Sequence, residues 1–284
     1  MREAIKKSEV LIEALPYIRK FFKKIVVIKY GGAAVDENGI EESIINDVIF
    51  MNYAGMRPII IHGGGPLISK MMKRAGLEPK FIHGRRVTDS QTVHIIEKAL
   101  RTINTKIVGT FRAMGCKAFG LSGRENNLIR VRKLKTDVDL GYVGEVTSVD
   151  TTVVKKLIED NIIPVIYPLG VGRDGSTYNV NADDVASEIA TALKAEKFVL
   201  LTNIRGIMKD KDNPKTLYPT LKASEVDALI KKGIINSGMI PKARSCVNAI
   251  KGGVKKAHIL NAGIPHALLL EMFTDKGIGT EIVK

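Results

Sequence analysis

Two glycine-rich turns, each directly after a short apolar run, are the part of this sequence that could do chemistry. The apolar run at residues 25–28 leads into Lys29 and the glycine pair at 31–32. A second apolar run at 58–61 leads into a His-Gly-Gly-Gly-Pro stretch at 62–66. Glycine lets the backbone approach a ligand closely, and free N–H groups at a helix start attract anions. The two turns therefore predict a phosphate site with a lysine beside it.

Four other polar residues could belong to the same site. Lys242 lies near a predicted helix start, where a positive charge is unfavourable unless an anion compensates it. Arg86 could be one more surface arginine, but its side chain suits bidentate capture of a carboxylate. Asp183 is either a helix-capping acid or a functional group, and both interpretations stay open. We expect His62 to pack or hydrogen-bond within its turn, because no second metal ligand lies at a suitable spacing.

The elements that must position these residues follow from the apolar patterns. Strands are predicted at residues 25–28, 58–61, 117–121, 162–166, 197–201, 256–260 and 266–271. Helices are predicted at 1–22, 41–54 and 66–75, and a long one starts at Asp89, its expected N-cap, and runs to about 111. Further helices are predicted after Asp150, between 183 and 193, at 223–232 and after 238. A hairpin is expected at 127–149 and an irregular segment at 81–89. Alternating strands and helices predict an α/β fold with a mostly parallel sheet, whose carboxyl edge would join the two glycine turns.

Composition indicates a globular protein of a reducing compartment. The 284 residues are 45% hydrophobic, which is enough for a full core. We expect Cys116 and Cys246 to be free buried thiols, because their spacing fits no metal site. No apolar run approaches the roughly 18 residues of a membrane span, so no membrane partner is expected. The charged N-terminus lacks the apolar core of a signal peptide, which predicts a cytoplasmic location.

The net charge of +14 has three possible explanations, namely a nucleic-acid partner, an anionic substrate or a lysine-rich surface. The basic residues are spread along the chain, aromatic residues make up only 5%, and there is no tryptophan. Single-stranded nucleic acids are bound on aromatic stacking surfaces. We therefore expect no nucleic-acid partner.

Other motifs that contain glycine fit less well. The sequence has no Gly-Lys dipeptide, which excludes a P-loop nucleotide site. A His-Gly-Gly-Gly run also occurs in lipases, but the Gly-x-Ser-x-Gly elbow that they need is missing. The Gly-x-Gly-x-x-Gly pattern at 170–175 precedes another short strand and no helix, so we interpret it as a turn.

Five ordered motifs together resemble the amino acid kinase family, from about residue 25 to the C-terminus. They are KYGG at 29–32, IHGGGP at 61–66, GRRVTD at 84–89, NVNAD at 179–183 and GMIPK at 238–242. The resemblance implies a three-layer αβα sandwich around a mainly parallel sheet. The most similar members transfer the γ-phosphoryl group of ATP to the γ-carboxylate of N-acetyl-L-glutamate. The product is N-acetyl-L-glutamyl 5-phosphate, in the second step of arginine synthesis.

The resemblance also implies residue roles. Lys29 and Lys242 would neutralise charge on the transferred phosphoryl group, and Asp183 would orient both lysines. Substrate binding is implied for Gly64, Gly65, Arg86 and Asn179. Nucleotide binding is implied for Gly31, Gly32, Asn181, Thr202 and Asn203, although many relatives have an acidic residue where this chain has Asn203. Mg²⁺ should arrive with ATP, and we expect no metal site made by protein ligands alone.

Regulation and assembly are implied as well. Residues 1–22, with Pro16 as a kink, are similar to the helix that joins dimers in arginine-inhibited hexameric members, which are trimers of dimers. An allosteric arginine site is then implied at Tyr17, Lys197, His258, Glu271 and Gly277. The resemblance divides the rest into an acyl-amino-acid-binding half at 23–173 and an ATP-binding half at 174–284, which also holds the arginine site.

Two alternatives stay open. One is a kinase for a longer homologue, an N-acyl-aminoadipate of lysine synthesis, which the substrate loop around Arg86 would have to admit. The other is a non-catalytic amino-acid-binding module. The presence of Lys29, Lys242 and Asp183 speaks against the module, because a binding role needs no phosphoryl-transfer residues.

Overall fold

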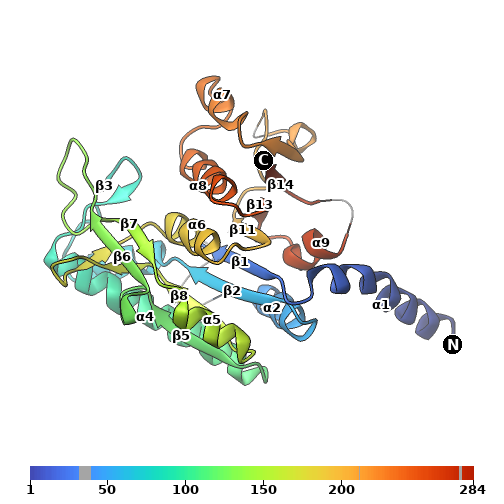
Figure 1. The fold of residues 1–284 in the computed structure, drawn as a ribbon. Coiled ribbons are helices and arrows are strands. Elements are labelled where there is room, and N and C mark those ends of the chain that lie inside the picture. Colours follow the sequence, from blue (N-terminus) through green and yellow to red (C-terminus); the bar gives the residue numbers. More distant parts are fainter. Residues whose placement is uncertain (32–39, 211, 275–276) are drawn as a thin grey trace.

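An eight-stranded sheet forms the centre of the computed structural model, which describes residues 1–31, 40–210, 212–274 and 277–284 (Figure 1). The strand order is β12-β14-β13-β11-β1-β2-β8-β5. The strands are β1 (Ile25–Tyr30), β2 (Arg57–His62), β5 (Ala118–Ser122), β8 (Ile163–Tyr167), β11 (Lys197–Thr202), β12 (Thr220–Lys222), β13 (Lys256–Asn261) and β14 (Thr280–Val283). Neighbouring strands run parallel except β13 and β14, which are antiparallel.

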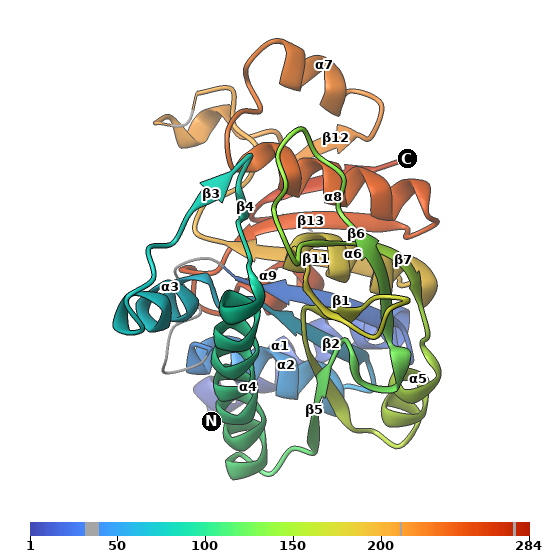
Figure 2. The ribbon, with the colours of Figure 1, turned by 90° about the vertical axis from the view of Figure 1, so that its left-hand side faces the viewer.

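Helices cover both faces of this sheet, and each face has its own apolar cluster. The first face packs against α2 (Glu42–Tyr53), α3 (Gly65–Arg74), α4 (Ser90–Ala113) and α9 (Ala267–Phe273). The second packs against α5 (Thr152–Glu159), α6 (Ala182–Ala192), α7 (Val226–Lys231) and α8 (Met239–Lys251). Figure 2 shows α4 on one side of the strands and α5 and α6 on the other. The expected three-layer α/β sandwich with a mainly parallel sheet is confirmed.

Two smaller sheets lie beside the main one. A four-stranded sheet combines β6 (Ile129–Lys133), β7 (Gly144–Val149), β9 (Leu169–Val171) and β10 (Thr177–Asn179), with short 3₁₀ turns at Glu125–Asn127 and, elsewhere, Pro214–Thr216. Strands β6 and β7 pair antiparallel, which confirms the hairpin expected at 127–149. The turn expected at 170–175 is also confirmed, because it joins the antiparallel pair β9 and β10.

The segment expected to be irregular at 81–89 contains a small hairpin. Strand β3 (Phe81–Ile82) pairs antiparallel with β4 (Arg85–Arg86). The two turn residues, His83 and Gly84, have φ angles of 50° and 74°. Two successive positive φ angles are typical of the tightest hairpin turns, and glycine adopts them without strain. The prediction missed the hairpin because each strand has only two residues.

The strand predicted at 266–271 was wrong, because these residues form most of the helix α9. A short apolar run is compatible with a strand or with a buried helix. Here the run is Ala-Leu-Leu-Leu-Glu-Met, which contains strong helix formers and no β-branched residue. The last strand is instead β14, at the end of the predicted glycine-rich tail.

The N-terminal helix α1 (Arg2–Phe21) extends away from the body of the molecule in Figure 1. Phe21 is buried in the first apolar cluster, whereas Leu11 and Ile12 are each 67% exposed. Pro16 lies inside α1, which continues through it. Within the described residues, no helix combines the length and the apolar character that crossing a bilayer requires.

Candidate active site

The two glycine turns lie side by side at the carboxyl edge of the sheet, as the sequence predicted. Strands β1 and β2 pair in parallel, and the Gly63 N–H donates to the Tyr30 carbonyl at 3.0 Å. Gly64 precedes the first residue of α3, and Pro66 stands in its first turn. The first N–H groups of a helix have no partner within it, so this turn is suited to an anion. The predicted residue Gly32 lies outside the described residues.

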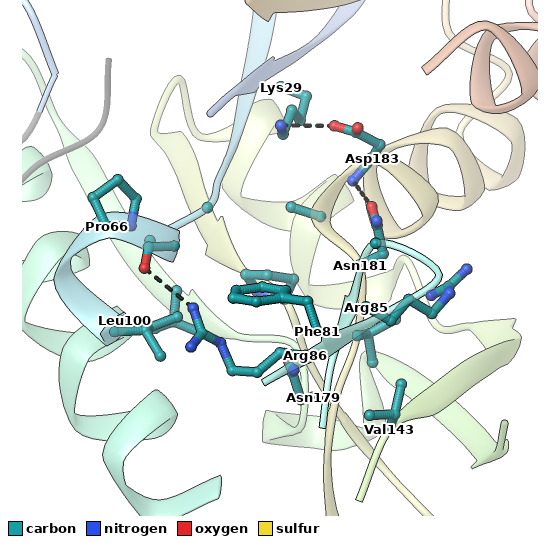
Figure 3. A pocket seen from close by; sticks show the side chains of 18 residues that line it. Lys29, Pro66, Phe81, Arg85, Arg86, Leu100, Val143, Asn179, Asn181 and Asp183 are labelled. Carbon is teal, nitrogen blue, oxygen red and sulfur yellow. Dashed lines mark hydrogen bonds and ion pairs between the residues drawn. The ribbon is translucent and has the colours of Figure 1, made fainter. Parts of the chain in front are cut away.

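Three charged side chains meet at this edge. The Nζ atom of Lys29 lies 2.7 Å from Oδ1 of Asp183, and the Nζ atom of Lys242 lies 2.9 Å from Oδ2 (the first pair is drawn in Figure 3). Successive side chains of a strand point to opposite faces. Val27 belongs to the cluster on the α6 and α8 side, so Lys29, two residues further, faces the same helices.

Lys29 on β1 and Asp183 on α6 are both almost fully buried. Burial alone would raise the pKa of Asp183, but the ammonium groups of Lys29 and Lys242 outweigh it and lower the pKa to about 2. Burial lowers the pKa of Lys29, and the carboxylate of Asp183 opposes that shift. Asp183 therefore stays ionised near neutral pH, and two lysine side chains share its one carboxylate.

Local structure holds each member of this cluster in place. The side chain of Asn181 caps α6 by accepting from the N–H groups of Asp183 and Asp184, at 2.7 and 3.4 Å. A β-carbon at Gly31 would overlap the Lys29 ammonium group. A side chain at position 31 would therefore require the end of the Lys29 side chain to move from its present place beside Asp183.

A cavity of about 350 Å³ opens beside the charged cluster (Figure 3). This size suits a small metabolite. The cavity is lined by Lys29, Gly63, Gly64, Gly65, Pro66, Ile68, Phe81, Gly84, Arg85, Arg86, Leu100, Val143, Pro168, Asn179, Val180, Asn181, Ala182 and Asp183. All four predicted substrate-binding residues are among them, together with Asn181, which we had expected at the nucleotide.

Arg86 is the main cation on the far wall of the cavity. Its guanidinium group donates to Ser69 Oγ at 2.9 Å and to the Gly65 carbonyl at 3.3 Å, and it lies 4.6 Å from the centre of the Phe81 ring. Burial lowers its pKa. Asn179 is held nearby, since its amide donates to Thr88 Oγ1 at 3.2 Å. A small molecule in the cavity could therefore place a carboxylate against Arg86 while its other end approaches Lys29.

His62 supports the second glycine turn from behind. It is fully buried, and burial lowers its pKa to about 4. Asn104 lies 3.1 Å from Nε2 and donates to the Val165 carbonyl, while Nδ1 lies 2.9 Å from the Gly63 carbonyl. In the neutral ring, Nε2 accepts from Asn104 and Nδ1 donates to Gly63. The predicted hydrogen bond within the turn is confirmed.

Three of the predicted nucleotide-binding residues, Gly31, Thr202 and Asn203, are not among the described residues that line the cavity. Gly31 follows β1, and Thr202 ends the neighbouring strand β11 at the same edge of the sheet. The Thr202 hydroxyl accepts from the Ile204 N–H at 3.0 Å, which shapes the loop after β11. Asn203 is exposed in that loop.

A second cavity gathers the residues that the sequence placed in a regulatory site. It lies where α1 and α9 meet the strands β11, β13 and β14. Tyr17, Lys197, Glu271 and Gly277 line it. His258 lies below, with its Nδ1 atom 2.8 Å from Glu271 Oε1. Although burial would raise the pKa of Glu271, contact with His258 and the Ile278 N–H lowers it. Four of the five predicted residues therefore line one cavity, and the fifth, His258, contacts one of them.

Sequence reasoning missed three contributors. Ser69 and Phe81 position Arg86, and Asp184 forms an ion pair with Arg85 at 2.9 Å. Each depends on which distant elements pack together. One sequence signal was available, the two turn residues His83 and Gly84, which are typical of a tight hairpin. In such a hairpin Arg85 and Arg86 are successive residues of one strand, so their side chains point to opposite faces.

No metal site built by the protein is found in the part of the chain that the structure describes. No group of three or more His, Cys, Asp or Glu side chains there could hold an ion. The carboxylate of Asp183, which lines the same cavity as the second glycine turn, is already paired with Lys29 and Lys242.

Comparison with known proteins gives one family. The model of the amino acid kinase family matches residues 24–261. Proteins named acetylglutamate kinase from Methanocaldococcus jannaschii and Moorella thermoacetica are 48% and 47% identical to this chain. These alignments cover 100% and 98% of this chain and 98% of each relative.

Solved structures agree on the fold. An N-acetylglutamate synthase from Neisseria gonorrhoeae, in complex with coenzyme A and N-acetyl-glutamate, superposes with a TM-score of 0.85 at 27% identity. The match covers 98% of this chain but only 63% of that one. A carbamate kinase from Giardia lamblia has a TM-score of 0.65 at 18% identity and supports the fold alone.

Proposed function

This chain belongs to the amino acid kinase family and is a kinase. We propose its substrates from that premise. It transfers the γ-phosphoryl group of ATP to the γ-carboxylate of N-acetyl-L-glutamate and forms N-acetyl-L-glutamyl 5-phosphate. The Lys29–Asp183–Lys242 cluster beside a cavity with Arg86 carries the proposal. Relatives named acetylglutamate kinase, 44–48% identical over nearly the whole chain, support it.

The chemistry in this proposal is mainly electrostatic. A γ-carboxylate is already ionised at neutral pH, so the reaction needs no general base. Lys29 and Lys242 stabilise the negative charge of the transferred phosphoryl group, and Asp183 holds both ammonium groups in place. N–H groups of Gly64 and Gly65 at the start of α3 bind oxygens of the reacting groups.

The substrate and the nucleotide approach from opposite halves of the sheet. Arg86, in the half formed by residues 23–173, binds the α-carboxylate. Asn179, which comes from the half formed by 174–284, holds the rest of the acyl amino acid. ATP binds the half formed by 174–284, near Asn181, Thr202 and Asn203, and its phosphates reach the glycines at 31–32. Mg²⁺ enters as part of the MgATP substrate, which agrees with a site whose own carboxylate is paired with lysines.

Feedback inhibition is the regulatory part of the proposal. Arginine binds the second cavity, where Glu271 meets its guanidinium group and Lys197 its carboxylate. Tyr17 brings α1 to the same cavity, and the exposed Leu11 and Ile12 give α1 an apolar surface for a partner subunit. The assembly is then a hexamer, a trimer of dimers joined by α1. The enzyme acts in the cytoplasm, in the second step of arginine synthesis.

Two rival activities remain to be tested. A longer N-acyl-aminoadipate could occupy the same cavity, since Arg86 recognises a carboxylate and not a chain length. A non-catalytic amino-acid-binding module is the other rival, because the synthase from N. gonorrhoeae shares the fold. The complete charged cluster favours a kinase over the module.

Release of ADP distinguishes the three hypotheses, which are the N-acetyl-L-glutamate kinase, the N-acyl-aminoadipate kinase and the binding module. The purified protein is incubated with MgATP and either N-acetyl-L-glutamate or N-acetyl-L-aminoadipate, each with and without arginine. Turnover of the glutamate derivative that falls sigmoidally with arginine is the expected result. Turnover without inhibition would remove the regulatory part, turnover of the longer acid alone would replace the substrate, and no turnover of either would favour the binding module.

A further inference from the structure

The β3–β4 hairpin carries two adjacent arginines with different partners. Arg86 reaches Ser69 and the Gly65 carbonyl at the start of α3. Arg85 reaches Asp184 on α6, with 2.9 Å between its Nη2 atom and Oδ2. Figure 3 shows the two guanidinium groups pointing in opposite directions. The hairpin is therefore attached through Arg86 to the substrate half and through Arg85 to α6.

The partner of Arg85 belongs to the phosphoryl-transfer region. Asp184 follows Asp183 in the first turn of α6. Its second oxygen lies 3.2 Å from Ser245 Oγ, whose single proton is shared between Asp184 and the Pro241 carbonyl at 2.9 Å. Ser245 lies one turn beyond Lys242 on α8. A single carboxylate thus connects the hairpin to the two helices that carry Asp183 and Lys242.

The hairpin has little apolar packing to hold it. Phe81 is 55% exposed, and each strand has two residues. At the tip, His83 lies 3.4 Å from Asp137, and both side chains are largely exposed. An exposed pair of this kind contributes little. The position of the hairpin over the cavity therefore depends on the contacts of Arg85 and Arg86.

Arg85 also stands at a boundary between two cavities. Gly84, Arg85 and Asn181 line both the substrate cavity and a neighbouring polar cavity that contains Asp184 and Ser245. Arg85 therefore lies between the two cavities, and its partner Asp184 lines the second of them.

We propose that the Arg85–Asp184 ion pair is a latch that holds the β3–β4 hairpin over the substrate cavity. The latch holds Arg86 where it can bind the α-carboxylate of the acyl amino acid when α6 is in position for phosphoryl transfer. Arg85 is then a positioning residue that touches neither the substrate nor ATP. This inference rests on the proposed function and adds a determinant of affinity for the acyl amino acid.

A double-mutant cycle tests the latch kinetically. We expect Arg85→Gln and Asp184→Asn each to raise KM for N-acetyl-L-glutamate about two- to fivefold, the size that a partly exposed ion pair supports. The KM for ATP and kcat should change little, and the double variant should be no worse than either single one. Arg85→Lys, which keeps the charge, should restore most of the affinity. Additive effects, or equal changes in kcat, would overturn the latch.

The matched control is another ion pair on a hairpin, Arg132 with Glu145, at 2.8 Å. Neither residue lines the substrate cavity, and Arg132, the one to be substituted, does not line the neighbouring cavity either. Arg132→Gln should leave every kinetic constant unchanged. Higher salt should raise KM more in the original protein than in Arg85→Gln, because only the former has a pair to screen. Equal salt dependence would contradict the latch.

Hydrogen exchange provides a readout that needs no turnover. Backbone amides of residues 81–87 should exchange faster in Arg85→Gln and Asp184→Asn than in the unsubstituted protein, with the exchange of α4 unchanged. Unchanged exchange in the hairpin would overturn the latch even if the kinase assay succeeds. Faster exchange together with no turnover of N-acetyl-L-glutamate would instead overturn the proposed function alone.

Discussion

Lys29, near the end of the first strand, lies 2.7 Å from Asp183 in the first turn of α6. Lys242 completes the cluster from α8 at 2.9 Å. Removing one partner from a buried ion pair leaves an uncompensated charge, which is strongly unfavourable. Here two cations share one carboxylate, and this excess of positive charge is suited to a phosphoryl group that arrives between them.

Loss of either lysine should slow the chemical step. We expect Lys29→Met and Lys242→Met to lower kcat by about 10²–10³, the range for losing one preorganised charge contact in a transition state. ADP release at saturating substrates measures the effect. Lys251→Met, at the exposed end of the same helix as Lys242, is the control and should keep its kcat. Near-normal kcat in either site variant would contradict its role.

Asp183 should make stability depend on pH in a defined window. Its pKa in the folded state is about 2, below the value of about 3.9 in an unfolded chain, so folding is favoured above pH 4 and this contribution is lost as pH falls toward 2. We expect Asp183→Asn to lower the free energy of unfolding at pH 7 by about 2–3 kcal/mol or more.

Urea unfolding at pH 7, 5 and 3.5 measures this difference. It should stay constant from pH 7 to 5 and begin to shrink below pH 4. Asp227→Asn, an exposed acid in the first turn of α7, is the control and should change stability little at any of these pH values. A difference for Asp183→Asn that grows as pH falls would refute the assigned charge state.

Arg86 should control affinity for the acyl amino acid. Lysine keeps the charge but loses the planar fork that reaches Ser69 and Gly65 and can grip a carboxylate. We expect Arg86→Lys to raise KM for N-acetyl-L-glutamate roughly 10- to 100-fold, the range for a lost charge-assisted hydrogen bond, with KM for ATP unchanged. Arg101→Lys, at an exposed position on α4, is the control. An unaltered KM in Arg86→Lys would remove this residue from the substrate site.

His62 should also make stability depend on pH, but because of burial and not because of an ion pair. Burial lowers its pKa to about 4, whereas an unfolded histidine titrates near 6.5. The unfolded chain therefore binds a proton first, and this residue destabilises the fold as pH falls from 6.5 to 4. His62→Gln should cost stability at pH 7, and its deficit should narrow by roughly 1–2 kcal/mol at pH 5.

Urea unfolding of His62→Gln at both pH values provides the measurement. His94→Gln, at an exposed position on α4, serves as the control, and its difference from the unsubstituted protein should stay near zero. If the deficit of His62→Gln is the same at pH 5 and pH 7, the imidazole is not held neutral by burial.

Arginine inhibition should depend on Glu271 and on α1 in separable ways. Glu271→Gln removes one of the two glutamate carboxylates among the described residues that line the second cavity, the other being that of Glu281. It should weaken inhibition by arginine at least tenfold, with kcat preserved. Deletion of residues 1–14 keeps Tyr17 and the buried Phe21, and it should shrink the particle from a hexamer to a dimer. Light scattering and ADP release measure the two effects. A hexamer after the deletion would show that α1 does not join the subunits.

The sequence alone predicted most of the helices and strands, and it singled out residues that the structure brings together at the candidate site. Apolar runs that end in glycine predicted β1 and β2, and Asp89 was correctly expected to cap α4, where its carboxylate accepts from the Thr92 N–H at 2.7 Å. These features are local, since each depends on side-chain period, glycine conformation or a cap within a few residues. The order of five motifs was specific enough to indicate the family.

Only the tertiary structure decided which distant residues meet. The period of two showed that Lys29 shares a face with Val27, but not that this face is covered by α6 and α8, which bring Asp183 and Lys242. The helix at α9 replaced a predicted strand because its apolar run is buried against α2, and the ion pair of Arg85 with Asp184 had no local signal. Such contacts are set by the packing of whole layers, and the local backbone preferences of a sequence carry little information about them.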